Sequence, residues 1–182
     1  MYIYTIDGRA EPCNMIFANA FAKEMKRLGF KPFIIFMAEV FEDLLEEQVL
    51  NHRMTVEQKE DILESFDSLQ TRTDYHHQLC SAVRDKMEKL SDDYDCFIVP
   101  DIIMVAESEF FHYYTETDGG ASIGFRHRDM PLNLSKSYFD SLYDYLSPSN
   151  FDYTIKNMTD DSVKEAAKAI AEQEKRYGGS SI

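Results

Sequence analysis

The sequence predicts an α/β protein in which helices and a five-stranded, mostly parallel sheet form three layers. Short apolar runs rich in β-branched and aromatic residues are typical of buried strands. Between these runs, apolar residues recur at the three- and four-residue spacing of helices. Such alternation favours a parallel sheet with right-handed crossovers. A chain of 182 residues can bury one sizeable core, so we expect a single domain over residues 1–182.

The first strand, loop and helix occupy residues 2–29. Residues 2–6 are mostly β-branched or aromatic, and a turn signal follows at Gly8. From Asn14 onward, apolar residues recur at helical spacing until Gly29 ends the pattern. The apolar face of this predicted helix consists of Phe17, Phe21, Met25 and Leu28.

The loop between this strand and helix occupies the place of a phosphate loop. In many nucleotide-binding proteins it reads G-x-x-x-x-G-K-[ST], and its backbone N–H groups and Lys hold phosphates. In the frame that starts at Gly8, Cys13 stands in place of the second Gly and Asn14 in place of the Lys. Met15 replaces the Ser or Thr. The scaffold is retained, whereas the side chains of its phosphate chemistry are largely replaced.

A second strand and a helical insertion follow. Residues 33–37 form a continuous apolar run, which is typical of a strand buried on both faces. Residues 38–90 have helical periodicity and are predicted to form a helical insertion between two strands. Within it, Thr55 and Gln58 match a capping box, and Thr73 can cap a later helix. The apolar stripe of that later helix is Leu79, Cys80, Val83, Met87 and Leu90.

The third strand is predicted at residues 96–101. It ends at Asp101, and the carboxyl ends of strands are where open α/β sheets place ligand chemistry. A helix over residues 104–117 is predicted to stop at the Gly pair that follows.

The last part of the chain supplies two further strands and a helix. Residues 121–127 alternate in polarity and predict a fourth strand, and residues 151–155 predict a fifth. Between them, residues 129–150 contain two prolines and are interpreted as a lid-like segment. A final helix starts after Thr159, where acidic residues suit the positive end of the helix dipole.

The composition restricts the partners. The chain has 33 acidic and 19 basic side chains and a formal net charge of -14. This balance disfavours direct binding to nucleic acid or to an anionic membrane, and it is compatible with docking onto a basic protein surface. No apolar run reaches transmembrane length, and no signal peptide is recognisable. Three widely spaced cysteines, Cys13, Cys80 and Cys96, favour neither a disulfide nor a zinc framework, so a reducing cytoplasm is expected.

Several fragments, taken in order, resemble the deoxynucleoside monophosphate kinases of bacteriophages, a branch of the P-loop nucleoside monophosphate kinases. Residues 5–10 and 18–24 are similar to their first strand, loop and helix. Residues 98–103 are similar to the strand-end D-x-R segment, and residues 151–157 to the last strand. The resemblance implies a P-loop-kinase-like fold, for which we expect the strand order 2-3-1-4-5. It also implies transfer of the ATP γ-phosphoryl group to a deoxynucleoside monophosphate with magnesium.

Measured against this resemblance, several phosphate-binding groups are lost. Glu11 adds negative charge to the loop, and Pro12 has no N–H to donate. Asn14 can donate a hydrogen bond to a phosphate but cannot neutralise it. The sulfur of Met15 is a poor magnesium ligand, and Ile103 stands in place of the arginine of the D-x-R segment.

Other positions of the pattern survive. Gly8, Arg9, Asn14 and Asp101 are the candidate phosphate- and nucleotide-binding residues, and Arg9 can replace the missing Lys only from a different position. Asp101 is either a magnesium residue, through water, or a cap at the strand end. Arg126 and Arg128 are either catalytic lid residues, together with Arg9, or a solvated strand end.

Three functional hypotheses follow. The first is a degenerate kinase-like protein that transfers phosphoryl groups weakly or not at all and acts as a nucleotide- or protein-binding regulatory factor. The second is an active, ATP-dependent kinase with rearranged phosphate contacts. The third is an assembly or virion-associated subunit. ATP and magnesium are the cofactors that the resemblance implies, and the cytoplasm of a phage-infected bacterial cell is the expected location.

Overall fold

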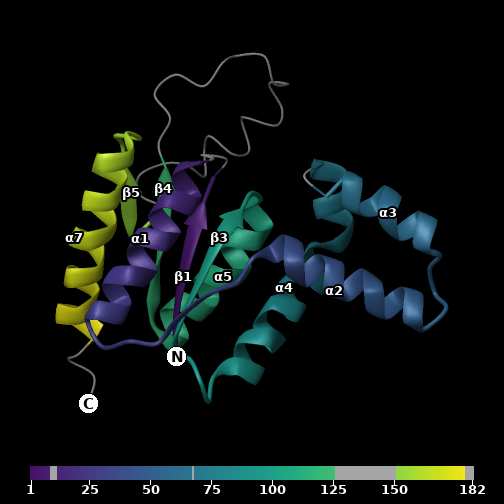
Figure 1. Ribbon diagram of the computed structural model, residues 1–182, viewed down its shortest axis with the longest axis horizontal. Coiled ribbons are helices and arrows are strands. Elements are labelled where there is room, and N and C mark those ends of the chain that lie inside the picture. Colours follow the sequence, from purple (N-terminus) through teal and green to yellow (C-terminus); the bar gives the residue numbers. More distant parts are fainter. Residues whose placement is uncertain (9–11, 67, 126–150, 179–182) are drawn as a thin grey trace.

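The chain forms one five-stranded, all-parallel sheet in the order β2-β3-β1-β4-β5, which confirms the predicted fold class and strand order. In the computed structural model (Figure 1), the described residues are all those outside 9–11, 67, 126–150 and 179–182. The strands are β1 (Tyr2–Asp7), β2 (Pro32–Ile34), β3 (Cys96–Ile102), β4 (Gly120–Phe125) and β5 (Tyr153–Ile155).

Helices connect the strands and cover both faces of the sheet. Those in the described part of the chain are α1 (Cys13–Arg27), α2 (Met37–Leu50), α3 (Val56–Glu64), α4 (Leu69–Leu90), α5 (Val105–Asp118) and α7 (Asp160–Gly178). Helices α2, α3 and α4 follow one another between β2 and β3, as predicted for the insertion. They extend to one side of the sheet as a helical arm, residues 37–90 (Figure 1).

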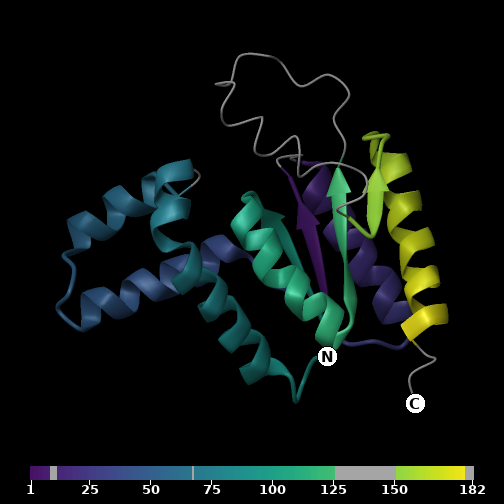
Figure 2. The same cartoon turned by 180° about the vertical axis from the view of Figure 1, so that it is seen from behind.

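The three layers result from two apolar cores, one on each face of the sheet (Figures 1 and 2). Helices α1 and α7 pack on one face, against a core that includes Tyr4 and Ile6 of β1. Helices α2, α4 and α5 pack on the other face, against a core that includes Ile3. Because successive side chains of a strand point to opposite faces, the neighbours Ile3 and Tyr4 belong to different cores.

Two predicted elements differ from the structure. The second strand was predicted at 33–37 and buried on both faces, but β2 has only three residues, all partly exposed. It lies at the sheet edge and pairs only with β3, and its apolar run continues into α2 from Met37. Thr73 does not cap a helix, because α4 begins earlier. Ser68 is the N-cap there, and its hydroxyl accepts a hydrogen bond from the Thr71 N–H.

Other local predictions have direct outcomes. The capping box of α3 is confirmed, because Thr55 and Gln58 exchange both hydrogen bonds. The predicted strand at 121–127 corresponds to β4, whose described residues end at Phe125. The lid-like segment at 129–150 lies outside the described residues. No helix in the described part of the chain combines the length and apolar character needed to span a membrane.

Gly120 provides a test of how closely β1 and β4 approach each other. Its φ of 123° suits glycine, and a Cβ atom there would overlap the Ile3 carbonyl group of β1. We expect Gly120→Ala to lower the free energy of unfolding by about 3 kcal/mol or more. Gly29→Ala is the matched control, because its φ is also positive and no atom lies within 4 Å of the added Cβ. Its cost should be about 1 kcal/mol, and equal losses in urea unfolding would contradict this packing.

Candidate functional site

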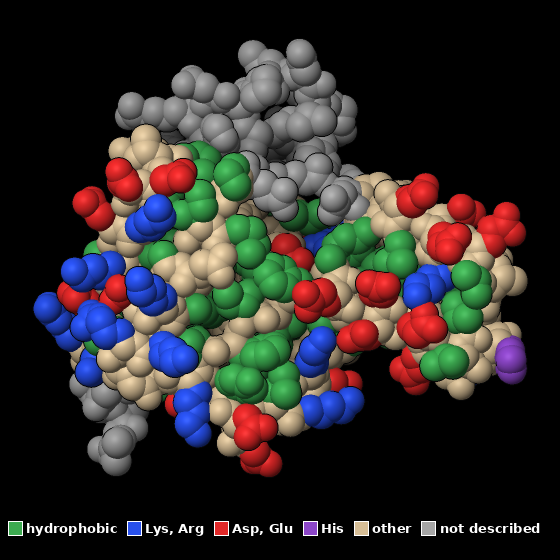
Figure 3. All heavy atoms as spheres, viewed as in Figure 1, with side chains coloured by type: hydrophobic (Ala, Val, Ile, Leu, Met, Phe, Trp, Pro, Cys, Tyr) green, Lys and Arg blue, Asp and Glu red, His purple; other side chains and the backbone are tan. Residues whose placement is uncertain are grey.

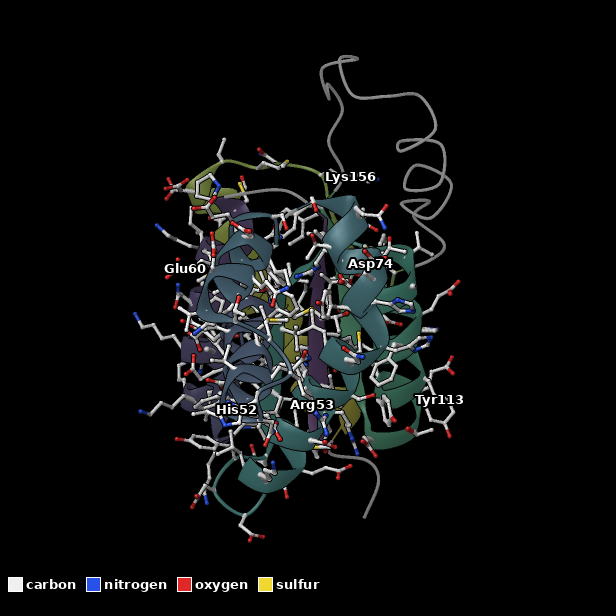
Figure 4. All side chains as sticks on the ribbon, turned by 90° about the vertical axis from the view of Figure 1, so that its right-hand side faces the viewer. His52, Arg53, Glu60, Asp74, Tyr113 and Lys156 are labelled. Atoms are coloured by element: carbon white, nitrogen blue, oxygen red, sulfur yellow. The ribbon has the colours of Figure 1, made fainter. Side chains whose placement is uncertain are left out.

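The candidate site is a cavity of about 470 Å³ beside the carboxyl ends of β1 and β3. Such a position is where open α/β sheets place their ligands. Its wall includes Gly8 and Asn14 from the loop and α1, and Pro100 and Asp101 from β3. The helical arm contributes Phe66, Arg72 and other residues. Figure 4 faces the arm and labels Glu60 and Asp74 on it; both side chains are exposed, and neither is among the residues that line the cavity.

Asn14 is bound to the backbone of two strand ends. Its side chain is 4% exposed, and its Nδ2 donates hydrogen bonds to the carbonyl oxygens of Gly8, at 2.6 Å, and Pro100, at 3.0 Å. Two carbonyl acceptors on one side fix the orientation of the amide, because only the nitrogen can donate. The Oδ1 atom is buried and has no hydrogen-bond partner among the described residues. The residue in the Lys position therefore joins the end of β1 to β3.

Asp101 caps helix α2 from a distance in the sequence. Its carboxylate accepts hydrogen bonds from the N–H groups of Met37, at 2.8 Å, and Ala38, at 3.3 Å. The N-cap residue Phe36 has no side-chain acceptor, so Asp101 supplies the acceptor that the helix end needs. Burial raises the pKa of Asp101 to about 6, against the lowering effects of these N–H groups and of the Arg72 charge.

The cap interpretation of Asp101 thus has named partners, whereas its magnesium role stays a prediction. In the described part of the chain, no group of three or more His, Cys, Asp or Glu side chains is arranged to hold a metal ion. Met15 and Ile103, which stand where the kinases that the sequence resembles have a hydroxyl and an arginine, both line the cavity.

Arg72 is a buried cation that the sequence analysis missed. It comes from the first turn of α4 and is 1% exposed. Its Nε lies 2.7 Å from Glu107 Oε1, and its Nη2 donates to Glu107 Oε2 and to the Asp101 carbonyl oxygen, both at 2.9 Å. The guanidinium also lies 4.4 Å from the centre of the Phe66 ring. The available signal was its position two helical turns before Leu79, on the apolar stripe of α4.

Glu107 completes this arrangement at the start of α5. It is fully buried, and its Oε2 accepts hydrogen bonds from the N–H groups of Ile103, at 3.1 Å, and Met104, at 3.2 Å. One carboxylate therefore caps α5 and neutralises Arg72. The pair joins the arm to the end of β3 and to α5.

Asp7 is a second buried carboxyl group at the end of β1. The Thr5 hydroxyl donates to its Oδ2 at 3.0 Å. Burial raises the pKa of Asp7 to about 7, against the lowering effects of the Ser108 and Thr5 hydroxyls, and the Glu107 charge raises it further.

The predicted site residues therefore have different outcomes. Gly8, Asn14 and Asp101 lie together on the cavity wall. Arg9, Arg126 and Arg128 lie outside the described residues. The thiol of Cys13 is 3.4 Å from the Met158 carbonyl oxygen, and burial raises its pKa, so a packing role fits better than a reactive thiolate.

The comparisons with known proteins add no family to this description. No protein-family model matches the chain. No curated protein and no solved structure matches it either. The architecture alone defines its class: an α/β protein with a five-stranded parallel sheet whose order is consistent with P-loop-like folds.

Removing one partner of the buried Arg72–Glu107 ion pair should lower the free energy of unfolding strongly. Arg72→Met leaves Glu107 buried without its cation, and such a loss costs about 3–5 kcal/mol of the free energy of unfolding. We expect Arg72→Met with Glu107→Gln to be less destabilised than Arg72→Met alone, because the neutral Gln still offers an oxygen to α5. Arg27→Met, at an exposed pair with Glu24, should leave stability nearly unchanged. Additive losses in urea unfolding would exclude the proposed coupling.

Asp7 should make stability depend on pH. Its pKa is raised from 3.8 to about 7, so the folded protein keeps a proton that the unfolded chain releases. The contribution of this group is fully present below about pH 4, and it is lost progressively as the pH rises from the unfolded pKa of 3.8 through the folded pKa of about 7. We therefore expect the stability of Asp7→Asn relative to the unmodified protein to rise between about pH 4 and about pH 7 and to stay constant at higher pH. The free energies of unfolding in urea are measured across this pH range, with the exposed Asp61→Asn as the control variant. A difference between Asp7→Asn and the unmodified protein that does not change with pH would contradict the prediction.

Proposed function

We propose that this chain is a degenerate deoxynucleoside monophosphate kinase-like protein that transfers phosphoryl groups weakly or not at all. It acts instead as a nucleotide- or protein-binding regulatory factor. The observation that carries the proposal is the position of Asn14, whose side-chain nitrogen donates to the Gly8 and Pro100 carbonyl oxygens. A group that is already paired with the backbone of two strand ends offers little to a phosphate.

The charges around the cavity support this proposal. Phosphoryl transfer depends on neutralising the negative charge of the phosphates, and losing such groups costs several orders of magnitude in rate. Among the described residues that line the cavity, Arg72 is the basic one, and it is paired with Glu107. Asp101 places a carboxyl group on the same wall. A triphosphate in the cavity would therefore contact a described wall that has no excess of positive charge.

The shortage of free oxygen ligands for magnesium supports the proposal as well. The P-loop hydroxyl would ligate the ion, and Met15 has no oxygen in its side chain. The Asp101 carboxylate, the other candidate, accepts hydrogen bonds from the start of α2. Releasing it toward a metal would leave those N–H groups without their acceptor.

The alternative, an active kinase with rearranged phosphate contacts, has one observation in its favour. Arg72 brings a guanidinium from the arm to the end of β3, where Ile103 replaces the arginine of the family pattern. Arg9, Arg126 and Arg128 would have to supply the remaining positive charge in this version.

A turnover assay tests the two versions against each other. The protein is incubated with ATP, magnesium and each deoxynucleoside monophosphate, and ADP and deoxynucleoside diphosphate are both quantified. We expect no product above the background of a heat-denatured sample, because the loop lacks its Lys and its hydroxyl. Robust product formation that follows the protein through size-exclusion chromatography would contradict the first version. Calorimetry with the same nucleotides shows whether any of them binds without turnover.

A further inference from the structure

We propose that the cavity binds a cationic hydrogen-bond donor, an ammonium or guanidinium group. This inference deepens the proposed function and rests on it, since it assumes a cavity that does not hold a triphosphate. The group can come from a small free amine or from a Lys or Arg side chain of a protein partner. Both sources present the same chemistry to the wall.

The hydrogen-bonding groups of the wall are mainly acceptors. The Asp101 carboxylate lies on the wall and can accept further hydrogen bonds besides those from α2, whereas the unpartnered Oδ1 of Asn14 is buried behind the cavity surface. The Gly8 and Pro100 carbonyl oxygens are also acceptors, and each accepts a hydrogen bond from Asn14. The guanidinium of Arg72 is the main side-chain donor, and its Nε and Nη2 already face Glu107 and the Asp101 carbonyl. A ligand that donates hydrogen bonds therefore fits better than one that accepts them.

The charged side chains of the wall also favour a cationic ligand. Arg72 and Glu107 neutralise each other at 2.7 Å, which leaves the Asp101 carboxyl group as the remaining charged side chain of the described wall. In a poorly hydrated cavity, a cation close to a carboxylate gains several times the energy that it gains in water. A phosphate or another anion would meet repulsion from the same group.

The shape and the aromatic residues suit an organic cation. A volume of about 470 Å³ is in the range of small-molecule sites and exceeds what a bare ammonium ion fills. Phe36 and Phe66 line the cavity, and aromatic faces attract cations. The ring of Phe66 already lies 4.4 Å from the guanidinium of Arg72, so Phe36 is the aromatic side chain of the described wall that is left for the ligand.

The acidic surface of the arm would attract such a ligand. On the face shown in Figure 3, acidic side chains gather over the arm, whereas basic side chains gather over the opposite end of the molecule. Lys59 is the basic residue of α2 and α3, and it is paired with Glu46. Long-range attraction of this kind raises the association rate of cations and weakens as salt is added.

The test is a titration of the protein with probes of matched size. The free cations are n-butylammonium and n-butylguanidinium, and the side-chain source is represented by N-acetyl-lysine amide, N-acetyl-arginine amide and short peptides containing them. Neutral n-butanol and inorganic phosphate are the comparison ligands. We expect saturable binding of at least one cation, with NMR shifts at the Asn14 side-chain amide and the Ala38 N–H. Preference for free amines or for peptides distinguishes the two sources.

Asp101→Asn should weaken cation binding by about tenfold, as expected for the loss of one charged hydrogen-bond partner. The Asn oxygen can still accept from α2. Glu60→Gln removes the same charge from an exposed face of the arm and should leave the affinity within about twofold at moderate salt.

Several outcomes would overturn the inference. These are the absence of cation binding, equal binding of butanol or phosphate, and equal effects of the two substitutions. If Asp101→Asn does not fold, the shift map of the unmodified protein decides, and shifts that avoid Asn14 and Ala38 contradict the site. If no cation binds and the turnover assay also shows no product, only this inference is overturned. If the turnover assay shows phosphoryl transfer, the proposed function on which the inference rests is overturned.

Discussion

The buried ion pair between Arg72 and Glu107 is the interaction on which the site depends. Both side chains are almost completely removed from water, so each charge needs the opposite charge close by to offset the cost of its burial. Arg72 belongs to the helical arm, and Glu107 caps the helix that follows β3. Their pairing therefore fixes the base of the arm against the end of the sheet. Since the cavity lies between the arm and the strand ends, the ion pair also determines where the cavity lies.

The other polar groups at this end of the sheet are engaged in a similar way. Asn14 joins the ends of β1 and β3, and Asp101 joins β3 to the start of α2. Each of these side chains replaces or occupies a position that the kinase resemblance associates with phosphate or magnesium. In this chain they stabilise the connections between elements. A fold consistent with P-loop-like folds can thus keep its architecture while these polar groups connect its elements.

Local pattern predicted most of the fold, and long-range contacts account for the differences. The alternation of apolar runs and helical periods, with the kinase resemblance, led to the correct sheet order, and Thr55 with Gln58 identified a helix start. The start of α2 soon after β2 involves Asp101, which lies far away in the sequence and accepts a hydrogen bond from the Met37 N–H. For the site, Gly8, Asn14 and Asp101 could be predicted to lie together, because strand ends meet at one edge. For Arg72 the position on the apolar stripe of α4 was a weak signal, since a helical arginine is usually solvated and its distant partner Glu107 explains its burial.

The most direct test of this account is the behaviour of the Asn14 side-chain amide when ATP and magnesium are added. We expect its two protons to exchange slowly with solvent and their NMR frequencies to change little up to millimolar nucleotide. The hydrogen bonds to Gly8 and Pro100 would then persist with nucleotide present. A large, saturable change in these signals, together with faster exchange, would mean that Asn14 leaves the two carbonyl groups to bind phosphate, and it would contradict the account.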